Sequence, residues 1–383
     1  HVGYYLNGPG LSQLMAEQKG ELRTTERIRS GLSENLGQIY LFFILAVTAI
    51  LTGLCAVFAA AVTGPQALLN IIAAGTVALI PSSEIAVAAA NFLACKVKKP
   101  AFIPRLELKT GIPEELSTMV VIPAILSDRK TVEHLLDNLE SHYLANREEN
   151  LFFAILGALR DADGPSRQND TDVIRLAVDG VRALNTKYAK EGKELFYFFN
   201  RLRKLNESDG KWTGWERKRG ALMEFNELLL GSQETSFIIH SSSRLPHREI
   251  RYVITLDADT MLPFGTAKKL IGTMAHPLNR PVIDPVRGIV TEGYGVMQPR
   301  ISFDIDSANR SVFSRILTGQ EGIDPYSCAI SDVYQDIFGE GIFTGKGIYE
   351  LKTFHAVLKD AIPENAVLSH DLLEGSYARA ALV

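Results

Sequence analysis

The chain is poor in cysteine and has no excess of basic residues. Its three cysteines, Cys55, Cys95 and Cys328, are an odd number without CxxC spacing, which argues against a disulfide framework and a zinc site. The formal net charge of -4 lacks the basic excess usual in nucleic-acid-binding domains, so we expect no nucleic acid among the partners. A length of 383 residues allows one large domain or two ordinary ones.

Charged residues are missing altogether from Asn35 to Ser83. Within this region, residues 36–62 form an apolar run whose helix would rise about 40 Å, against a hydrocarbon core of about 30 Å. A buried core helix is the alternative. A second apolar run, 66–95, carries Pro81 and Glu84 near its centre. It predicts either a second span with an intramembrane carboxylate, or residues 81–84 near a membrane interface or at a break between two shorter helices.

Only a Thr-Gly-Pro turn at 63–65 separates the two runs, which predicts an antiparallel hairpin. Basic residues flank the pair on both sides but are missing from the turn, so the positive-inside rule places both ends in the cytoplasm. We therefore predict a cytoplasmic lead-in at 1–33, a two-helix transmembrane hairpin at 34–99 and a cytoplasmic domain at 100–383. The flanking basic residues are Arg23, Arg27, Arg29, Lys96, Lys98, Lys99 and Arg105.

From Ser117 onward, short apolar runs alternate with longer helical patterns, which is typical of an α/β sheet with crossover helices. The pattern predicts a doubly wound sheet that binds its ligands at the carboxyl ends of the strands. The predicted strands are 118–123, 151–156, 195–199 and 252–256, and the predicted helices lie near 131–148, 171–191 and 215–230.

The fourth predicted strand ends in Asp257-Ala-Asp259. Two carboxylates at this spacing can face one ligand, and such oxygens suit Mg²⁺ or Mn²⁺ with substrate phosphates in the remaining positions. A solvated turn or a helix cap is the alternative. An aspartyl phosphatase motif is disfavoured, because Met261 occupies its fifth position and the motif follows the fourth strand rather than the first.

Two further motifs lie near the end of the chain, FTGKGI at 343–348 and SHDLLEG at 369–375. The first is not a P-loop, because no serine or threonine follows Lys346. In the second, Asp371 opens a helical pattern. It is therefore either a helix cap or a general base that takes a proton from an attacking hydroxyl.

Taken in order, the segments TMVVIPA, KRGAL, DAD, FTGKGIY and SHDLLEG resemble membrane-bound family 2-type glycosyltransferases of the GT-A fold. The segments HVGYYL, RYVITLDADTMLP and GEGIFTGKGIYE resemble still more closely the glycosyltransferase domain of cyclic β-1,2-glucan synthases. The resemblance therefore covers nearly the whole chain. It implies an α/β fold with a GT-A type doubly wound mixed sheet and flanking helices, preceded by the transmembrane hairpin. It also implies inverting transfer of glucose from UDP-glucose to a β-1,2-glucan acceptor, at the bacterial inner membrane.

The resemblance carries roles over to matching positions. Asp257 and Asp259 would bind Mg²⁺ or Mn²⁺, and Asp371 would be the catalytic base. The positions matching donor-binding motifs are Asp161 (or Asp163), Lys218, Arg219, Asp257 and Asp259. The positions matching the loop between donor and acceptor are Phe343, Thr344, Gly345 and His370.

Several of these positions also have a structural interpretation. Lys218 and Arg219 could instead form a solvated helix face, and Trp212 and Trp215 could stack on sugar or uracil or simply pack a loop. The family's Gln/Arg-x-x-Arg-Trp helix, its further membrane helices and a phosphorylase-like domain do not occur before Val383. We therefore expect a piece of a larger synthase that is truncated at its C-terminus. A catalytically incomplete nucleotide-sugar-binding segment and a synthase of another polysaccharide stay open as alternatives.

Overall fold

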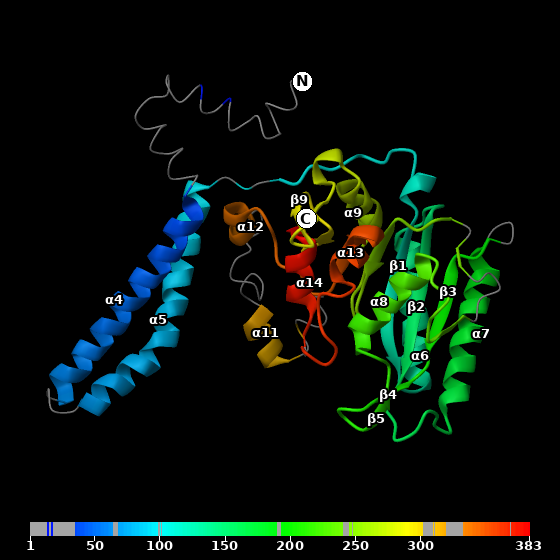
Figure 1. The fold of residues 1–383 in the computed structure, drawn as a ribbon, viewed down its shortest axis with the longest axis horizontal. Coiled ribbons are helices and arrows are strands. Elements are labelled where there is room, and N and C mark those ends of the chain that lie inside the picture. The colour runs from blue at the N-terminus through cyan, green and yellow to red at the C-terminus, as the bar shows by residue number, and fades with distance from the viewer. Residues whose placement is uncertain are drawn as a thin grey trace. The chain divides into compact units, whose positions relative to one another are not determined.

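The computed structural model describes most of the chain as two compact units. One unit contains residues up to 101 together with 303–339, and the other contains 102–302 and 340–383. Figure 1 draws both units. The predicted lead-in at 1–33 falls on residues outside the described ranges. The described residues are 35–63, 68–98, 102–189, 193–239, 245–246, 248–301, 311–318, 332–367 and 369–383, with a few isolated positions besides.

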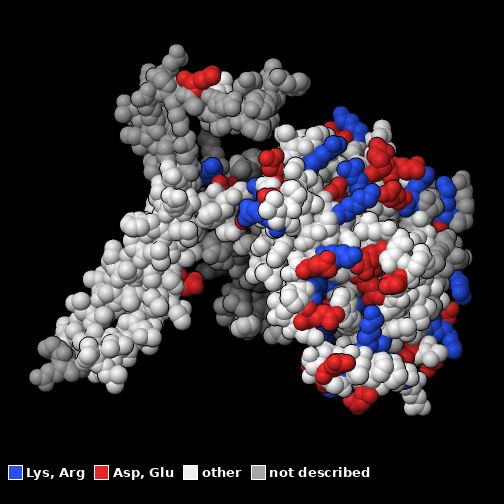
Figure 2. Space-filling model, viewed as in Figure 1, with Lys and Arg blue, Asp and Glu red and all other residues white. Residues whose placement is uncertain are grey.

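Two long apolar helices, α4 (Leu36–Thr63) and α5 (Leu68–Val97), dominate the first unit. They pack against one another, and the Tyr40 hydroxyl donates to Asn91 Oδ1 at 2.7 Å in a buried contact between them. Most of their remaining apolar side chains are exposed. Figure 2 shows the hairpin surface almost free of charge, whereas acidic and basic side chains mix over the other unit. By length and composition, both helices could cross a membrane.

The helix α5 runs without a break through Pro81. The alternative of two shorter helices separated near 81–84 is therefore wrong, and Glu84 lies exposed on a continuous helix. Two short helices from late in the sequence, α11 (Val312–Thr318) and α12 (Val333–Phe338), also belong to this unit. The predicted domain of 100–383 thus includes a segment that clusters with the hairpin.

The second unit is built on an eight-stranded mixed sheet with the order β12-β10-β11-β7-β1-β2-β3-β6. β7, β1, β2 and β3 are parallel, and β11 and β6 run antiparallel to their neighbours β7 and β3. The strands are β1 (Thr118–Leu126), β2 (Leu151–Leu159), β3 (Phe196–Arg201), β6 (Phe237–Ile239), β7 (Tyr252–Thr255), β10 (Val296–Gln298), β11 (Gly347–Glu350) and β12 (Ala380–Leu382).

Helices cover both faces of this sheet, because its central strands bury the side chains of both faces. Along β1, Val120 and Ile122 join the core under α6, α7 and α9, while Met119 and Val121 join the core under α8 and α13. Small hairpins, β4 (Lys204–Asn206) with β5 (Lys211–Thr213) and β8 (Val282–Asp284) with β9 (Ile289–Glu292), lie outside the sheet. The helices are α6 (Arg129–Ala145), α7 (Asp170–Tyr188), α8 (Arg217–Leu229), α9 (Thr266–Met274), α13 (Leu351–Leu358) and α14 (Asp371–Ala378).

The predicted fold class is confirmed, since all four predicted strands and all three predicted helices occur within a few residues of their expected bounds. The chain winds from β1 through β2 to β3 on one side, and later returns to place β7 on the other side of β1. The carboxyl ends of β1 and β7 therefore meet at a topological switch point, where open α/β sheets bind their ligands.

Candidate active site

The Asp-Ala-Asp motif leaves the sheet at this switch point. The amide of Leu256 still donates to the Val121 carbonyl of β1 at 3.0 Å, so the sheet holds the chain up to Asp257. The amide of Thr260 then donates to the Asp257 carbonyl at 3.0 Å and closes the turn. The Asp257 side chain is half-buried, whereas Asp259 is exposed.

Two lysines hold the Asp257 carboxylate. Lys218 Nζ donates to Oδ1 at 2.5 Å, and Lys346 Nζ lies 2.9 Å from Oδ2. Burial opposes ionisation of this carboxyl, but the hydrogen bonds and charges of the two lysines outweigh burial and hold its pKa below the ordinary value. The Asp257 carboxylate is therefore ionised at neutral pH.

The chemistry of Asp257 and Asp259 fits a divalent cation. Asp257 is ionised, and the Asp259 carboxylate makes no hydrogen bond or ion pair with any described residue. Carboxylate oxygens of this kind are the ligands that Mg²⁺ and Mn²⁺ prefer. The two ammonium groups on Asp257 act as counter-charges that such a cation would replace.

A strained turn at the start of α8 directs Lys218 toward Asp257. Glu216 and Arg217 have φ of 50° and 47°, a left-handed conformation that is uncommon outside glycine. Gly220 permits this turn, because a Cβ at that position would lie 2.0 Å from the Trp215 carbonyl oxygen. Strain of this sort persists only where the surroundings enforce it.

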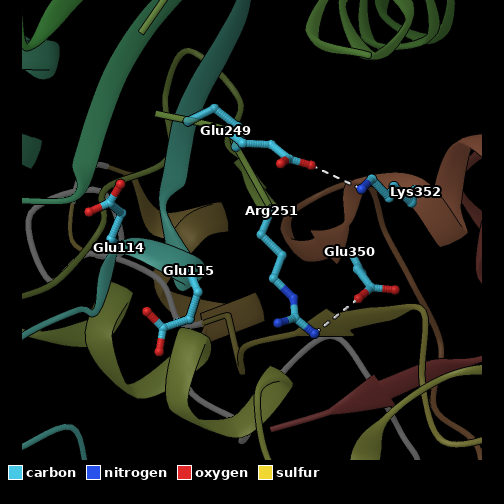
Figure 3. A pocket seen from close by; sticks show the side chains of 7 residues that line it. Glu114, Glu115, Glu249, Arg251, Glu350 and Lys352 are labelled. Carbon is cyan, nitrogen blue, oxygen red and sulfur yellow. Dashed lines mark hydrogen bonds and ion pairs between the residues drawn. The ribbon is translucent and has the colours of Figure 1, made fainter. Parts of the chain in front are cut away.

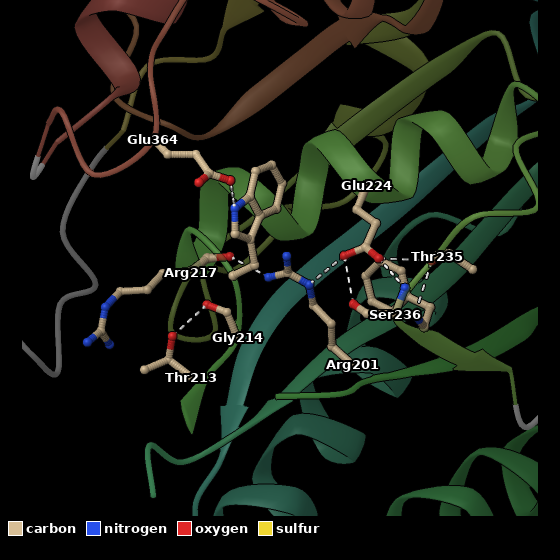
Figure 4. A network of polar contacts seen from close by, with 10 residues as sticks. Arg201, Thr213, Gly214, Arg217, Glu224, Thr235, Ser236 and Glu364 are labelled. Atoms are coloured by element: carbon tan, nitrogen blue, oxygen red, sulfur yellow. Dashed lines mark hydrogen bonds and ion pairs between the residues drawn. The ribbon is translucent and has the colours of Figure 1, made fainter. Parts of the chain in front are cut away.

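A buried ion pair between Arg201 and Glu224 holds this turn in its strained conformation (Figure 4). Arg201 Nη1 donates to the Arg217 carbonyl at 3.0 Å, and Arg201 Nε donates to Glu224 Oε2 at 3.0 Å. Glu224 also accepts hydrogen bonds from the amide and hydroxyl of Ser236 and from the Thr235 hydroxyl. Burial opposes ionisation of Glu224, but these donors outweigh burial and keep its pKa below the ordinary value.

The predicted loop between donor and acceptor links Lys218 to Asp371. Phe343 is fully buried and anchors the loop in the core. The Gly345 carbonyl accepts a hydrogen bond from Lys218 Nζ at 2.8 Å. On its other side, a Cβ at Gly345 would lie 2.5 Å from Asp371 Oδ1, so only glycine fits against that carboxylate. Thr344 is exposed, and its amide and hydroxyl donate to a Gln298 side-chain oxygen at 2.5 and 3.0 Å.

Asp371 is the first residue of α14, and its carboxylate caps no amide among the described residues. Its Oδ1 is buried and makes no hydrogen bond with them. His370 Nδ1 lies 3.5 Å from this oxygen and 2.9 Å from Oε1 of Glu374, which is buried. The three side chains form a group whose potential ligand atoms lie within 4.8 Å of one another. The described residues therefore do not support the interpretation of Asp371 as a helix cap.

Two other predicted residues lie apart from Asp257. Asp161 accepts a hydrogen bond from Arg217 Nη2 at 3.0 Å. It lies further out because β1 and β2 continue to the Leu126–Leu159 pair, well past the level at which β7 ends. The Arg219 guanidinium is buried and points elsewhere: it pairs with Glu216 at 2.8 Å and donates to the Ile362 carbonyl at 2.9 Å. The structure brings together Lys218, Asp257, Gly345 and Asp371 but not Arg219.

Three residues of this region were missed by the sequence analysis: Lys346, Gln298 and Glu374. Lys346 stood in the FTGKGI motif, which was considered as a P-loop and matched to the loop between donor and acceptor, but this lysine was given no role. Its position depends on β11 lying antiparallel beside β7, a long-range pairing without a local signal. Glu374 stood one helical turn after His370, and that spacing could have revealed the pair.

A cavity of about 650 Å³ lies at the opposite end of β7 (Figure 3). Arg251 pairs there with Glu350 at 3.5 Å, and Lys352 pairs with Glu249 at 2.9 Å. Both basic side chains of the cavity are thus paired, while Glu114 and Glu115 add further negative charge to its lining. It lies at the amino ends of β1 and β7, away from the carboxyl ends that carry Asp257.

Comparison with known proteins identifies a relative. No family model matches this chain. The chain is 45% identical over 305 residues to the cyclic beta-(1,2)-glucan synthase NdvB of Rhizobium meliloti (strain 1021). The match covers 79% of this chain but only 11% of that protein, so the chain spans a small part of the relative's length. The predicted resemblance is confirmed: this chain is a domain related to cyclic β-1,2-glucan synthases.

Proposed function

We propose that this chain is the glucosyl-transfer domain of a larger membrane-bound polypeptide, and that it transfers glucose from UDP-glucose to the 2-hydroxyl of a growing β-1,2-glucan. The observation that carries the proposal is the series of contacts from Asp257 through Lys218 and Gly345 to Asp371. It joins a carboxylate suited to a metal-bound diphosphate to a carboxylate suited to accept a proton. The similarity to a glucan synthase supports the choice of product.

On the donor side, Asp257 and Asp259 would hold Mg²⁺ or Mn²⁺. When bound, that ion would act as a Lewis acid on the departing diphosphate. Lys218 would pair with a phosphate, because its ammonium group already lies at Asp257, the carboxylate that would hold the metal. Asp161, with Arg217 beside it, would accept hydrogen bonds from the uracil or the ribose.

On the acceptor side, Asp371 would be the general base. The acceptor oxygen forms a bond to the anomeric carbon while the bond from that carbon to the diphosphate breaks and its electron pair leaves with UDP. The hydroxyl proton passes to Asp371. Attack from the face opposite UDP inverts the configuration at the anomeric carbon. Oδ1 of Asp371 accepts no hydrogen bond from the described residues, with the His370 ring 3.5 Å away, and this supports the role of proton acceptor.

The hairpin of α4 and α5 would anchor the domain as two spans of a multi-pass protein in the bacterial inner membrane. Support comes from the length, apolar composition and exposure of both helices. The basic residues that flank the hairpin would lie on the cytoplasmic side. The sheet unit would then face the cytoplasm, where nucleotide sugars are made.

Calorimetric titration of UDP-glucose into the detergent-solubilised chain tests the donor site. We expect saturable binding with Mn²⁺ or Mg²⁺, which EDTA abolishes and which Asp259→Ala removes. Asp179→Ala is the matched control, because Asp179 lies exposed on α7 and, among the residues that the structure describes, pairs with Arg182 at 3.7 Å. Folded protein that shows no metal-dependent binding would contradict the proposal.

Transfer is tested separately in a complete polypeptide that contains this domain, with labelled UDP-glucose and linkage analysis of the product. Incorporation into a β-1,2-glucan is the expected result. Donor binding without transfer would identify a nucleotide-sugar-binding segment that lacks turnover. A product with another linkage would identify a synthase of a different polysaccharide.

A further inference from the structure

We propose that Lys346 is a second diphosphate-binding residue, which together with Lys218 occupies Asp257 as a counter-ion until metal and donor bind. This inference rests on the proposed function, because it takes a metal-bound nucleotide sugar as the ligand. It starts from one observation: an ammonium group lies on each oxygen of Asp257, at 2.5 Å for Lys218 and 2.9 Å for Lys346.

The backbone around Lys346 fixes the direction of its side chain. Gly345 has φ of 80°, and a Cβ there would meet the Asp371 carboxylate at 2.5 Å. Gly347 has φ of 152°, and a Cβ there would lie 2.2 Å from the Met297 carbonyl oxygen. Only glycine fits on either side of the lysine. The GKG sequence therefore directs the Lys346 side chain toward Asp257, at the carboxyl end of β7. A residue with a side chain could not replace either flanking glycine without a change in the backbone.

The contacts on Asp257 are suited to exchange. The Lys218 and Lys346 side chains are each 24% exposed, and the Asp257 side chain is 34% exposed. An ion pair with this exposure keeps contact with water, which can solvate its partners when they separate. A lysine ammonium is also a compact point charge on a flexible stem, so it can move to a new partner without losing a fixed geometry.

The charges balance before and after such an exchange. Without ligands, the two positive charges of Lys218 and Lys346 equal in number the negative charges of Asp257 and Asp259, although both ammonium groups lie on Asp257. With ligands, a divalent cation neutralises the carboxylates, and the lysines neutralise the two negative charges of a nucleotide-sugar diphosphate. When both metal and donor bind, Asp257 and the two lysines each exchange one oppositely charged partner for another. None of these half-buried groups is left without a counter-charge, which would cost free energy.

Metal and donor should therefore bind cooperatively. A cation that binds alone would displace Lys218 and Lys346 and leave both without a counter-charge. The diphosphate supplies that counter-charge, so each ligand should raise the affinity for the other by the same factor. Removing one lysine weakens this coupling, because one fewer ammonium group competes with the metal and one fewer contacts the phosphates.

The test is Mn²⁺ binding to the full chain, measured from the electron paramagnetic resonance signal of free Mn²⁺ with and without UDP. For Lys346→Met, we expect Mn²⁺ affinity without UDP to rise about three- to tenfold, and the factor by which UDP raises it to fall about five- to tenfold. Lys352→Met is the matched control: this exposed lysine pairs with Glu249 at the other end of the sheet and should behave as wild type.

Lys346→Gln is a second variant in case the methionine disturbs folding, which tryptophan fluorescence would report. A rise in Mn²⁺ affinity together with weaker coupling in either folded variant supports the proposal. Unchanged or lower Mn²⁺ affinity without UDP in both folded variants overturns it while leaving the proposed function intact. Failure of the proposed function would show differently, as wild-type chain that binds no UDP-glucose with Mn²⁺, and that result would overturn both.

Discussion

The helix α8 serves two charged clusters that use the same chemistry in different ways. Near its start, Lys218 contacts Asp257, whose other partner is also a lysine. About two turns later, Glu224 pairs with Arg201. The Asp257 side chain is 34% exposed, whereas Glu224 is 7% exposed and Arg201 is 1% exposed.

The partners differ as much as the burial. Glu224 accepts from a backbone amide, two hydroxyls and a guanidinium, so several donors from different segments hold it in place. Asp257 is held by flexible ammonium groups alone. The buried cluster of Arg201 and Glu224 holds the strained turn in place. In the partly exposed cluster around Asp257, the lysines can exchange partners. Rigid support behind a replaceable contact is what a ligand site requires.

The largest expected effect is at Asp371, where a substitution should lower the rate of transfer without lowering stability. Asp371 touches neither cluster on α8 directly, yet its carboxylate is the proposed base. Asp371→Asn should lower kcat for glucosyl transfer about 10²- to 10⁴-fold, since the amide cannot accept the proton. Donor affinity and stability should stay close to wild type. The measurement is label transfer from UDP-glucose in a complete polypeptide, with donor binding followed by calorimetry.

Asp360→Asn is the control for that variant, because Asp360 is an exposed aspartate ahead of the same helix. It should leave kcat unchanged. If Asp371→Asn retained wild-type kcat, or if Asp360→Asn lost it as well, Asp371 would not be the base.

The second effect falls on the buried cluster. Glu224→Gln leaves the Arg201 guanidinium buried without its counter-charge, so we expect a loss of about 3–5 kcal/mol in the free energy of unfolding. Both tryptophans of the chain, Trp212 and Trp215, lie in the sheet unit, so their fluorescence follows unfolding of that unit alone. The control is Glu140→Gln, since Glu140 forms a more exposed pair with Lys187 and should cost no more than about 1 kcal/mol. Equal losses of unfolding free energy in the two variants would show that burial does not set the cost of removing the carboxylate.

The fold was predictable because its signals are local. β1 and β2 begin at the predicted residues and run on to Leu126 and Leu159, β7 lies within its predicted range, and the Asp257 motif stands at the end of its strand. What could not be predicted depends on contacts between distant segments. The direction of Arg219 is set by a loop carbonyl at Ile362, and the place of Lys346 is set by the pairing of β11 with β7. A basic residue in a motif thus predicts charge at a site, but tertiary contacts decide which side chain reaches it.

The histidine His142 adds a case to the comparison of Asp257 with Glu224, because it is buried in its uncharged form. His142 on α6 accepts a hydrogen bond at Nδ1 from the amide of Leu262, shortly after the Asp257 motif, at 3.3 Å. Burial lowers the pKa of His142 to about 4 from 6.5. The unfolded chain therefore binds a proton below about pH 6.5 that the folded chain does not bind until about pH 4. The free energy of unfolding should fall by about 3 kcal/mol across that window, and this contribution is fully present above it.

His142→Gln should remove this dependence, so that its free energy of unfolding changes less between pH 6.5 and pH 4 than that of wild type. Tryptophan fluorescence in denaturant at several pH values measures it. His134→Gln is the control, because His134 lies exposed on the same helix and should keep the wild-type slope. A wild-type slope in His142→Gln would show that other groups cause the acid sensitivity.

The smallest expected effect on stability is at Asp257 itself. Asp257→Asn makes the same carboxylate-to-amide change as Glu224→Gln, but its partners are partly exposed lysines that water can solvate. We therefore expect the free energy of unfolding to change by no more than about 1 kcal/mol, while metal-dependent UDP-glucose binding is lost. The Asp257 contacts should also weaken as salt is added, since exposed charges are screened, whereas the Glu224 cluster should respond little. A loss at Asp257 as large as that at Glu224 would mean that both clusters support the fold, and the lysines on Asp257 would then be structural partners rather than charges held ready for a ligand.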